Sequence, residues 1–110
     1  MGRWEDCVDL GIAAVQIFSA CLRHPRASNT NRDRALRTLQ AIGREAIPSL
    51  QEALNDKNRN VRMRAADGLG GIGDASSTSA LVRALEDEDY YVRERARSAL
   101  ALCKQNPKRE

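Results

Sequence analysis

Two stretches of this 110-residue chain repeat each other without a gap, and this repeat restricts the fold more than any other feature. Residues 50–69 (LQEALNDKNRNVRMRAADGL) align with residues 81–100 (LVRALEDEDYYVRERARSAL) at an offset of 31, and nine of the twenty positions are identical. A shorter third copy, residues 32–43, aligns with residues 62–73 at an offset of 30. Periods of roughly 20–50 residues are typical of solenoids, so the sequence predicts a stack of similar units.

The spacing of apolar residues predicts two helices in each unit. In the first helix, Val61, Ala65 and Leu69 recur every four residues and therefore share one face. The positions on that face are Val61, Ala65, Leu69 and Ile72, then Val92, Ala96, Leu100 and Cys103, and earlier Ala35, Leu39 and Ile42. The second helix carries Ile47, Leu50, Ala53 and Leu54, and its copy carries Leu81, Ala84 and Leu85. Neither pair can bury its apolar face alone, so neighbouring pairs must stack.

This pattern predicts an all-α chain of about six helices in a single domain spanning residues 1–110. The expected order is a capping helix over 3–23, repeat 1 over 31–56, repeat 2 over 58–87 and half of a third repeat over 89–105. Asn58 and Asp89 stand where N-cap residues are needed. Pro48 suits the first turn of a second helix, where its missing N–H costs nothing.

The glycines of residues 68–73 match G-x-G-x-x-G, the fingerprint of a phosphate-binding turn. The counterparts of the first glycine are Thr38 and Ala99, and a helical pattern rather than a strand precedes the motif. Gly73 alone has a glycine counterpart, Gly43, at the end of a helix. We therefore expect Gly43 and Gly73 to cap helices in the left-handed conformation, and the other glycines to permit close helix approach.

The pattern D-x-x-x-x-V-R-x-x-A-x-x-x-L-x-x-I-G, followed by a second helix ending in L-x-x-A-L, resembles HEAT-like repeats. The most similar variety is the short repeat named after phycobilisome lyases. The resemblance covers residues 32–103 and implies an α–α superhelix, a short solenoid. The leading helix lacks the motif, Asn31 replaces the usual Val, and Cys103-Lys104 replace Ile-Gly.

The resemblance also implies a structural ladder, in which a turn Asp of one repeat pairs with an Arg of a neighbouring repeat. The residues at these positions are Asp56 and Asp87, and Arg32, Arg62 and Arg93. A row of phosphate-binding arginines is the alternative role for the Arg series. Arg34, Arg64 and Arg95 lie farther from the apolar face, so we expect them to be freer to meet a ligand.

Residues that could carry chemistry are sparse. His24 is the only histidine, and no set of metal ligands can be assembled around it. In the acidic run over residues 86–89, Asp87 belongs to the ladder and Asp89 to a cap. We therefore expect no enzyme activity, no catalytic residue, and no cofactor or metal.

The three cysteines show no C-x-x-C spacing, which favours reduced thiols and a cytoplasmic location. The apolar run from Leu10 to Leu22 is too short to span a bilayer, so no membrane association is expected.

These observations favour a protein–protein interaction scaffold, because stacked short helices create extended surfaces for recognition. The partner is expected to contact exposed positions of the second helices, namely Gln51, Glu52, Asn55, Val82, Arg83 and Glu86. A homodimer is also expected through the last helix, with Tyr90, Tyr91, Val92, Ala96 and Leu100 at the contact.

Two alternatives remain. The net charge is +3, and residues 23–64 hold ten basic and four acidic residues, so a nucleic-acid-binding module is one alternative. Its candidate contacts are Arg26, Arg37, Arg44, Lys57, Arg59 and Arg64, although a charge run is more commonly a solvated face. The resemblance to lyase-type repeats implies the other, an accessory or lyase subunit acting on a chromophore-bearing protein.

Overall fold

A computed structural model describes the backbone of residues 4–105 and the side chains of residues 13–103. Within this part, the chain forms six α-helices and two 3-10 helices, and no strand. In chain order the elements are α1 (Trp4–Arg23), α2 (Asn29–Ile42), η1 (Arg44–Ala46), α3 (Ile47–Ala53), α4 (Arg59–Ile72), η2 (Ala75–Ser77), α5 (Thr78–Ala84) and α6 (Tyr90–Gln105). The predicted all-α fold class is therefore confirmed.

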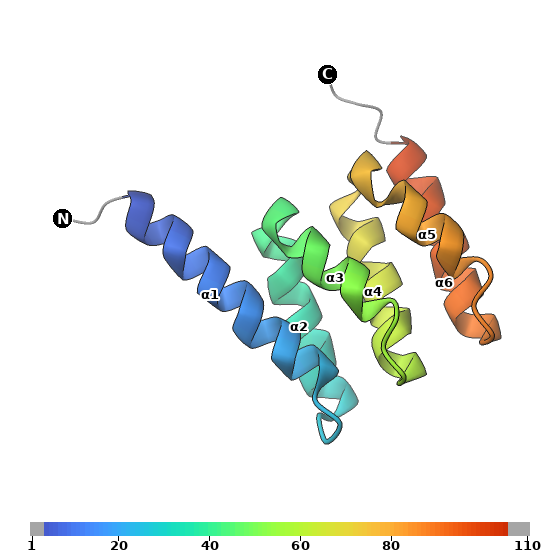
Figure 1. Cartoon of the computed structure of the whole chain (residues 1–110), viewed down its shortest axis with the longest axis horizontal. Helices are drawn as coiled ribbons and strands as arrows, with labels where there is room; N and C mark the ends of the chain where they lie inside the picture. Colours follow the sequence, from blue (N-terminus) through green and yellow to red (C-terminus); the bar gives the residue numbers. More distant parts are fainter. Residues whose placement is uncertain (1–3, 106–110) are drawn as a thin grey trace.

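The helices form two layers, with α1, α3 and α5 in one and α2, α4 and α6 in the other (Figure 1). The Cα trace measures 49 × 40 × 18 Å along its principal axes, which is a thin slab. In the second layer α2 packs on α4, and α4 packs on α6. Each unit thus contacts chiefly its neighbours, as in a solenoid.

The packed pairs are α1 with α2, α3 with α4, and α5 with α6. A short turn joins the two helices of each pair, whereas η1 and η2 lead from one pair to the next. The expected division into residues 31–56 and 58–87 follows the sequence period and groups α2 with α3 and α4 with α5, and it stays a prediction.

Equivalent positions of the repeat have the same environment in the core. Val61 and Val92 are both 0% exposed, and Leu50 and Leu81 in the other layer are also 0% exposed. The apolar faces predicted from the spacing are therefore the faces on which the helices pack. Burial of these faces supplies the main stabilising free energy, about 25 cal/mol for each Å² of apolar surface removed from water.

Cys103 is confirmed as a core residue rather than a reactive thiol. Its side chain is 3% exposed, and its Sγ lies 3.9 Å from the carbonyl oxygen of Leu69. Burial raises the pKa of the Cys103 thiol, with a smaller contribution from the charge of Asp74, so the reactive thiolate is disfavoured. Cys21 is half-buried against the core, and the side chain of Cys7 lies outside the described residues.

Helix α4 continues without a break through the glycines at 68, 70 and 71, so the phosphate-binding turn is absent there. A Cβ on Gly70 would lie 2.9 Å from the Cα of Ala99 in α6, and a Cβ on Gly68 would lie 2.7 Å from Cδ1 of Leu36 in α2. The prediction that these glycines permit close helix approach is confirmed.

The two helix-ending glycines differ in conformation. Gly73 has φ 70° and ψ 26°, the predicted left-handed cap, but Gly43 has φ 86° and ψ −131°, so that prediction is wrong for Gly43. The second copy has one additional residue, Asp74, which caps η2 by accepting a hydrogen bond from the backbone N–H of Ser76 at 2.8 Å. Gly43 both ends α2 and precedes η1, whereas Gly73 is separated from η2 by Asp74.

The residues predicted to cap the N-termini of α4 and α6 do so through their side chains. Oδ1 of Asn58 and of Asp89 each accept a hydrogen bond at 2.8 Å from the backbone N–H two residues later. Ser28, which the sequence analysis did not identify, caps α2 by accepting from the N–H of Asn31 at 3.1 Å. Helix α2 consequently begins at Asn29, two residues before the expected start of repeat 1.

Candidate functional site

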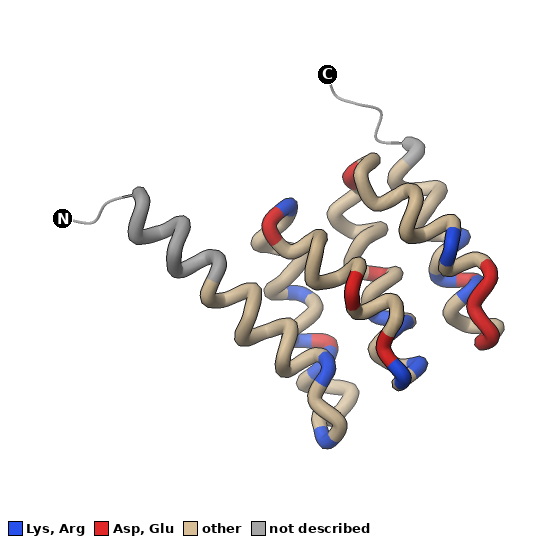
Figure 2. The backbone as a smooth tube through the Cα atoms, viewed as in Figure 1, with Lys and Arg blue, Asp and Glu red and all other residues tan. Residues whose placement is uncertain are grey.

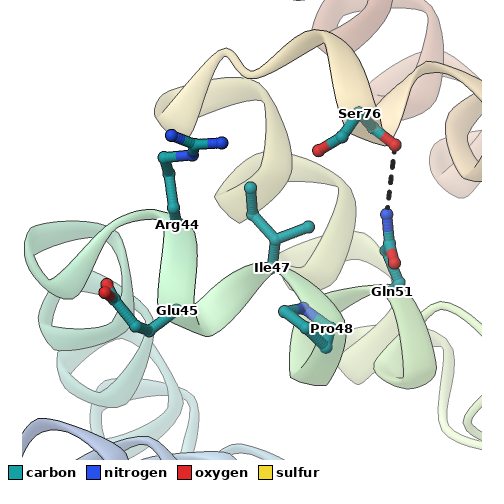
Figure 3. A pocket seen from close by; sticks show the side chains of 6 residues that line it. All are labelled: Arg44, Glu45, Ile47, Pro48, Gln51 and Ser76. Carbon is teal, nitrogen blue, oxygen red and sulfur yellow. Dashed lines mark hydrogen bonds between the residues drawn. The ribbon is translucent and has the colours of Figure 1, made fainter.

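A groove lies between the η1–α3 segment and the η2–α5 segment. Its larger depression has a volume of about 580 Å³ and is lined by Arg44, Glu45, Ile47, Pro48, Gln51 and Ser76 (Figure 3). A smaller depression of about 130 Å³ is lined by Gln51, Leu54, Asn55, Ala80, Arg83, Ala84 and Asp87. Gln51 lines both, and its Nε2 donates a hydrogen bond to the carbonyl oxygen of Ser76 at 3.3 Å. We call this surface the α3–α5 groove.

The α3–α5 groove exists because the second helices are short. Helices α3 and α5 have 7 residues each, whereas α2 and α4 have 14. Helix α3 packs on α4 and α5 packs on α6, rather than closely on each other. The long helices hold the short ones at the repeat spacing, and the surface between the short ones stays open.

Three of the six residues predicted for partner binding, Gln51, Asn55 and Arg83, line the α3–α5 groove. Of the other three, Glu52 lies toward α1, where its Oε1 is 3.6 Å from Nη1 of Arg23. Val82 is 49% exposed on α5, and Glu86 is exposed in the turn after that helix; neither lines the groove.

The groove residues that the sequence analysis missed are Arg44, Glu45 and Ser76, all of which lie in η1 or η2. These short 3-10 helices have no periodicity that a sequence pattern could reveal. Pro48 was identified as a helix-start signal, but its exposed ring also forms part of the groove wall.

The cations at the edge of the α3–α5 groove differ in their pairing. Nε of Arg44 lies 3.3 Å from Oδ2 of Asp74, which links η1 to the segment before η2. Arg83 is exposed and makes no ion pair or hydrogen bond with the residues that the structure describes. Arg83 therefore leaves an uncompensated positive charge beside the smaller depression.

In the repeated Arg series, Arg62 joins the turn between α3 and α4 to the turn between α5 and α6. Its Nη1 donates to the carbonyl oxygens of Asp56 at 2.9 Å and Lys57 at 3.1 Å. Its Nε lies 2.9 Å from Oδ2 of Asp87, and the guanidinium is largely buried. Charge-assisted, two-point contacts of this kind are stronger than ordinary surface ion pairs.

The first member of the series makes different contacts. Nε of Arg32 donates to the carbonyl oxygen of Leu22 at 3.1 Å, and Nη2 donates to that of His24 at 2.9 Å. The turn acid that would correspond to its ladder partner, Asp56, instead pairs with Nε of Arg23 at 3.4 Å. Arg32 thus fixes the turn between α1 and α2.

The expectation that Arg64 and Arg95 are free to meet a ligand is wrong. Nε of Arg64 lies 2.9 Å from Oδ1 of Asp33 on α2, and Arg95 pairs with Asp67 on α4. Burial raises the pKa of Asp67, and the neighbouring Arg95 opposes that rise. Both arginines therefore connect adjacent helices of the second layer.

Half of the basic surface expected for nucleic acid is compensated by ion pairs. Of its six residues, Arg44 pairs with Asp74, Arg64 pairs with Asp33, and Nη1 of Arg59 lies 2.9 Å from Oδ2 of Asp89. Figure 2 shows acidic and basic positions close together at the turns. The remaining three, Arg26, Arg37 and Lys57, belong to three different segments.

The homodimer contact expected through α6 is wrong in its apolar part. Val92 and Ala96 are 0% exposed and Leu100 is 8% exposed, because α4 and α5 already cover this face. Only the two tyrosines stay accessible, with Tyr90 57% and Tyr91 55% exposed.

No group of three His, Cys, Asp or Glu side chains among the described residues could hold a metal ion. His24 is exposed, and its Nδ1 accepts a hydrogen bond from the backbone N–H of Arg26 at 3.0 Å. Among the described helices, none combines the length and apolar character needed to cross a membrane.

Comparison with known protein families identifies a match over most of the chain. The family model for HEAT repeats matches residues 15–101, from within α1 to near the end of α6. No curated protein matches the chain.

Proposed function

Because this chain belongs to the HEAT repeat family, we propose that it is a non-enzymatic scaffold that binds a segment of a partner protein in the α3–α5 groove. HEAT repeats generally mediate protein–protein interactions, and the family is typically non-catalytic. The partner segment lies between α3 and α5, with an apolar side chain against Ile47 and Pro48 and an acidic group near Arg83.

The observation that carries this proposal is the depression that stays open between α3 and α5. Many charged side chains of the second layer and the turns are engaged in pairs between neighbouring units, such as Arg64 with Asp33 and Arg59 with Asp89. The groove combines an open depression of about 580 Å³ with the unpaired Arg83. The lining of this depression combines the apolar Ile47 and Pro48 with polar side chains, so it suits a segment that carries both apolar and polar groups.

The test compares groove variants with a matched surface variant. A partner is first isolated with the wild-type chain, and its affinity is then measured for Pro48→Glu and Arg83→Glu. Each should weaken binding at least about tenfold, which corresponds to about 1.4 kcal/mol. Arg37→Glu is the control for Arg83→Glu, because it makes the same change from a positive to a negative side chain, but on α2 in the opposite layer.

Circular dichroism establishes that each variant keeps its helices. Retention of the partner by both groove variants, or equal weakening by Arg37→Glu, contradicts the proposal. Failure of the wild-type chain to retain any protein at physiological salt contradicts it as well.

A further inference from the structure

The last arginine of the repeat series, Arg93, is held in the same way as its equivalent Arg62 in the preceding helix pair. Each donates Nη1 to two carbonyl oxygens of the turn before its own helix, at 2.9 and 3.1 Å for Arg62 and at 2.8 and 3.1 Å for Arg93. These contacts fix the guanidinium plane of both residues relative to the stack.

The two arginines differ in what meets the other side of the guanidinium. Arg62 meets Asp87, with Nε 2.9 Å from Oδ2 and Nη2 3.2 Å from Oδ1. No carboxylate among the described residues pairs with Arg93. Its remaining neighbour is the ring of Tyr90, whose centroid lies 5.8 Å from Cζ of Arg93.

We propose that Arg93 and Tyr90 form a docking site for an acidic helical hairpin of a partner protein, whose turn carries an aspartate that binds Arg93 as Asp87 binds Arg62. We call it the α6 docking site. It uses other residues than the α3–α5 groove. Arg and exposed Tyr are the residue types that most often dominate binding energy at protein interfaces.

Charge complementarity selects an acidic partner. Nη1 of Arg93 is already positioned by backbone carbonyls, so a carboxylate meets a guanidinium that loses little further freedom on binding. The planar guanidinium can donate two parallel hydrogen bonds to one carboxylate through Nε and Nη2. The contact between Arg62 and Asp87 shows that this repeat geometry accommodates a carboxylate beside the guanidinium, with a hydrogen bond from Nη2 and an ion-pair distance of 2.9 Å to Nε.

A second copy of this chain fits the site poorly. Stacking its α1–α2 pair on α5–α6 would present the turn after α1 to Arg93. The position equivalent to Asp56 in that turn, 30 residues earlier, is Arg26, which is exposed. Two arginines would then face each other, and juxtaposed like charges disfavour an interface.

The test uses a synthetic peptide of residues 74–105 as the probe. It contains α5 and α6 and lacks Arg62, so its Asp87 can bind another arginine. Circular dichroism first establishes that the peptide is helical on its own, and only a helical peptide is used in the titration. The peptide is titrated into the ¹⁵N-labelled full chain, and we expect saturable shifts at the amides of Tyr90 and Arg93. Asp87→Asn in the peptide and Arg93→Gln in the chain should each weaken binding at least about tenfold, the loss typical of a broken charge pair. Arg97→Gln, on the same helix, should leave the affinity unchanged.

Three results overturn the proposal: no saturable binding, equal binding by the Asp87→Asn peptide, or shifts confined to the α3–α5 groove. Sedimentation of the chain alone provides a further check. A self-associated species that Arg93→Gln dissociates would show that a second copy occupies the site, which also overturns the proposal. None of these results bears on Pro48 or Arg83, so the groove is tested separately.

Discussion

Gly70 allows α4 and α6 to approach more closely than any other residue would at its position. A Cβ there would lie 2.9 Å from both Cα and Cβ of Ala99, and a backbone atom cannot rotate away. We expect Gly70→Ala to lower the free energy of unfolding by about 1–3 kcal/mol, as overpacking does. This loss should exceed the gain of about 1 kcal/mol from the better helix propensity of Ala. Urea unfolding followed by circular dichroism measures the change.

Gly71→Ala is the matched control, because the neighbouring residue of the same helix faces a flexible side chain. Its Cβ would meet Nε2 of Gln40 at 2.3 Å, and that amide can move aside at the loss of its hydrogen bond to the carbonyl of Asp67. The free energy of unfolding should change by less than about 1 kcal/mol. A Gly70→Ala variant at least as stable as the wild type would show that the two helices do not touch at this point.

Ser77 is a second position at which a single buried group, the side-chain hydroxyl, is expected to change the free energy of unfolding. This residue is 0% exposed, and its Oγ has no hydrogen-bond partner among the residues that the structure describes. The equivalent residue 31 positions earlier is Ala46, which is also 0% exposed, so alanine fits this site in the repeat. Ser77→Ala should raise the free energy of unfolding by about 1 kcal/mol, because a buried unsatisfied hydroxyl is removed.

The reverse substitution, Ala46→Ser, should lower the free energy of unfolding by a similar amount in the same urea experiment. If Ser77→Ala is destabilising instead, its hydroxyl makes a contact in solution that offsets its burial.

At the scale of single helices, the parts of the fold that follow from local pattern could be predicted from sequence. The face of α4 follows from the spacing of Val61, Ala65 and Leu69, and its start follows from Asn58. Periodicity and caps act within a few residues, so a sequence pattern contains them. Which helices pair could not be predicted in this way, because pairing depends on how each connection directs the chain.

The connections also limited prediction of the candidate site. Gln51 and Arg83 lie on α3 and α5, whose outward faces follow from their buried residues. Arg44 and Ser76 reach the groove only because η1 and η2 replace plain loops. Gly43 and Gly73 differ in conformation although they occupy aligned positions, and only the second copy carries the additional residue Asp74.

At the scale of the whole molecule, charge is distributed so that neighbouring units attract one another. Asp33 with Arg64, Asp67 with Arg95, and Arg59 with Asp89 each join residues about one repeat apart. Exposed ion pairs contribute little individually, on the order of 0–1 kcal/mol. Their larger effect here is on the electrostatic potential outside the protein, because each ion pair neutralises an arginine that could otherwise contact a phosphate.

This compensation leads to a prediction about nucleic acid. We expect the wild-type chain to show no saturable binding to labelled single- or double-stranded DNA at physiological salt. A protein with many phosphate contacts would instead lose affinity steeply as salt rises. Fluorescence anisotropy at two salt concentrations measures this, and a steep salt dependence with tight binding at low salt would contradict the prediction.

The matched variant for that experiment is the double substitution Asp33→Asn and Asp89→Asn. It releases Arg64 and Arg59 from their partners while keeping side chains of nearly the same shape, and Asn remains a good N-cap in place of Asp89. Since the removed carboxylates no longer compensate the two cations, DNA binding at low salt should become stronger than in the wild type. If the variant and the wild type bind DNA equally, these ion pairs do not determine the electrostatic potential that DNA meets. The absence of binding would then need another cause.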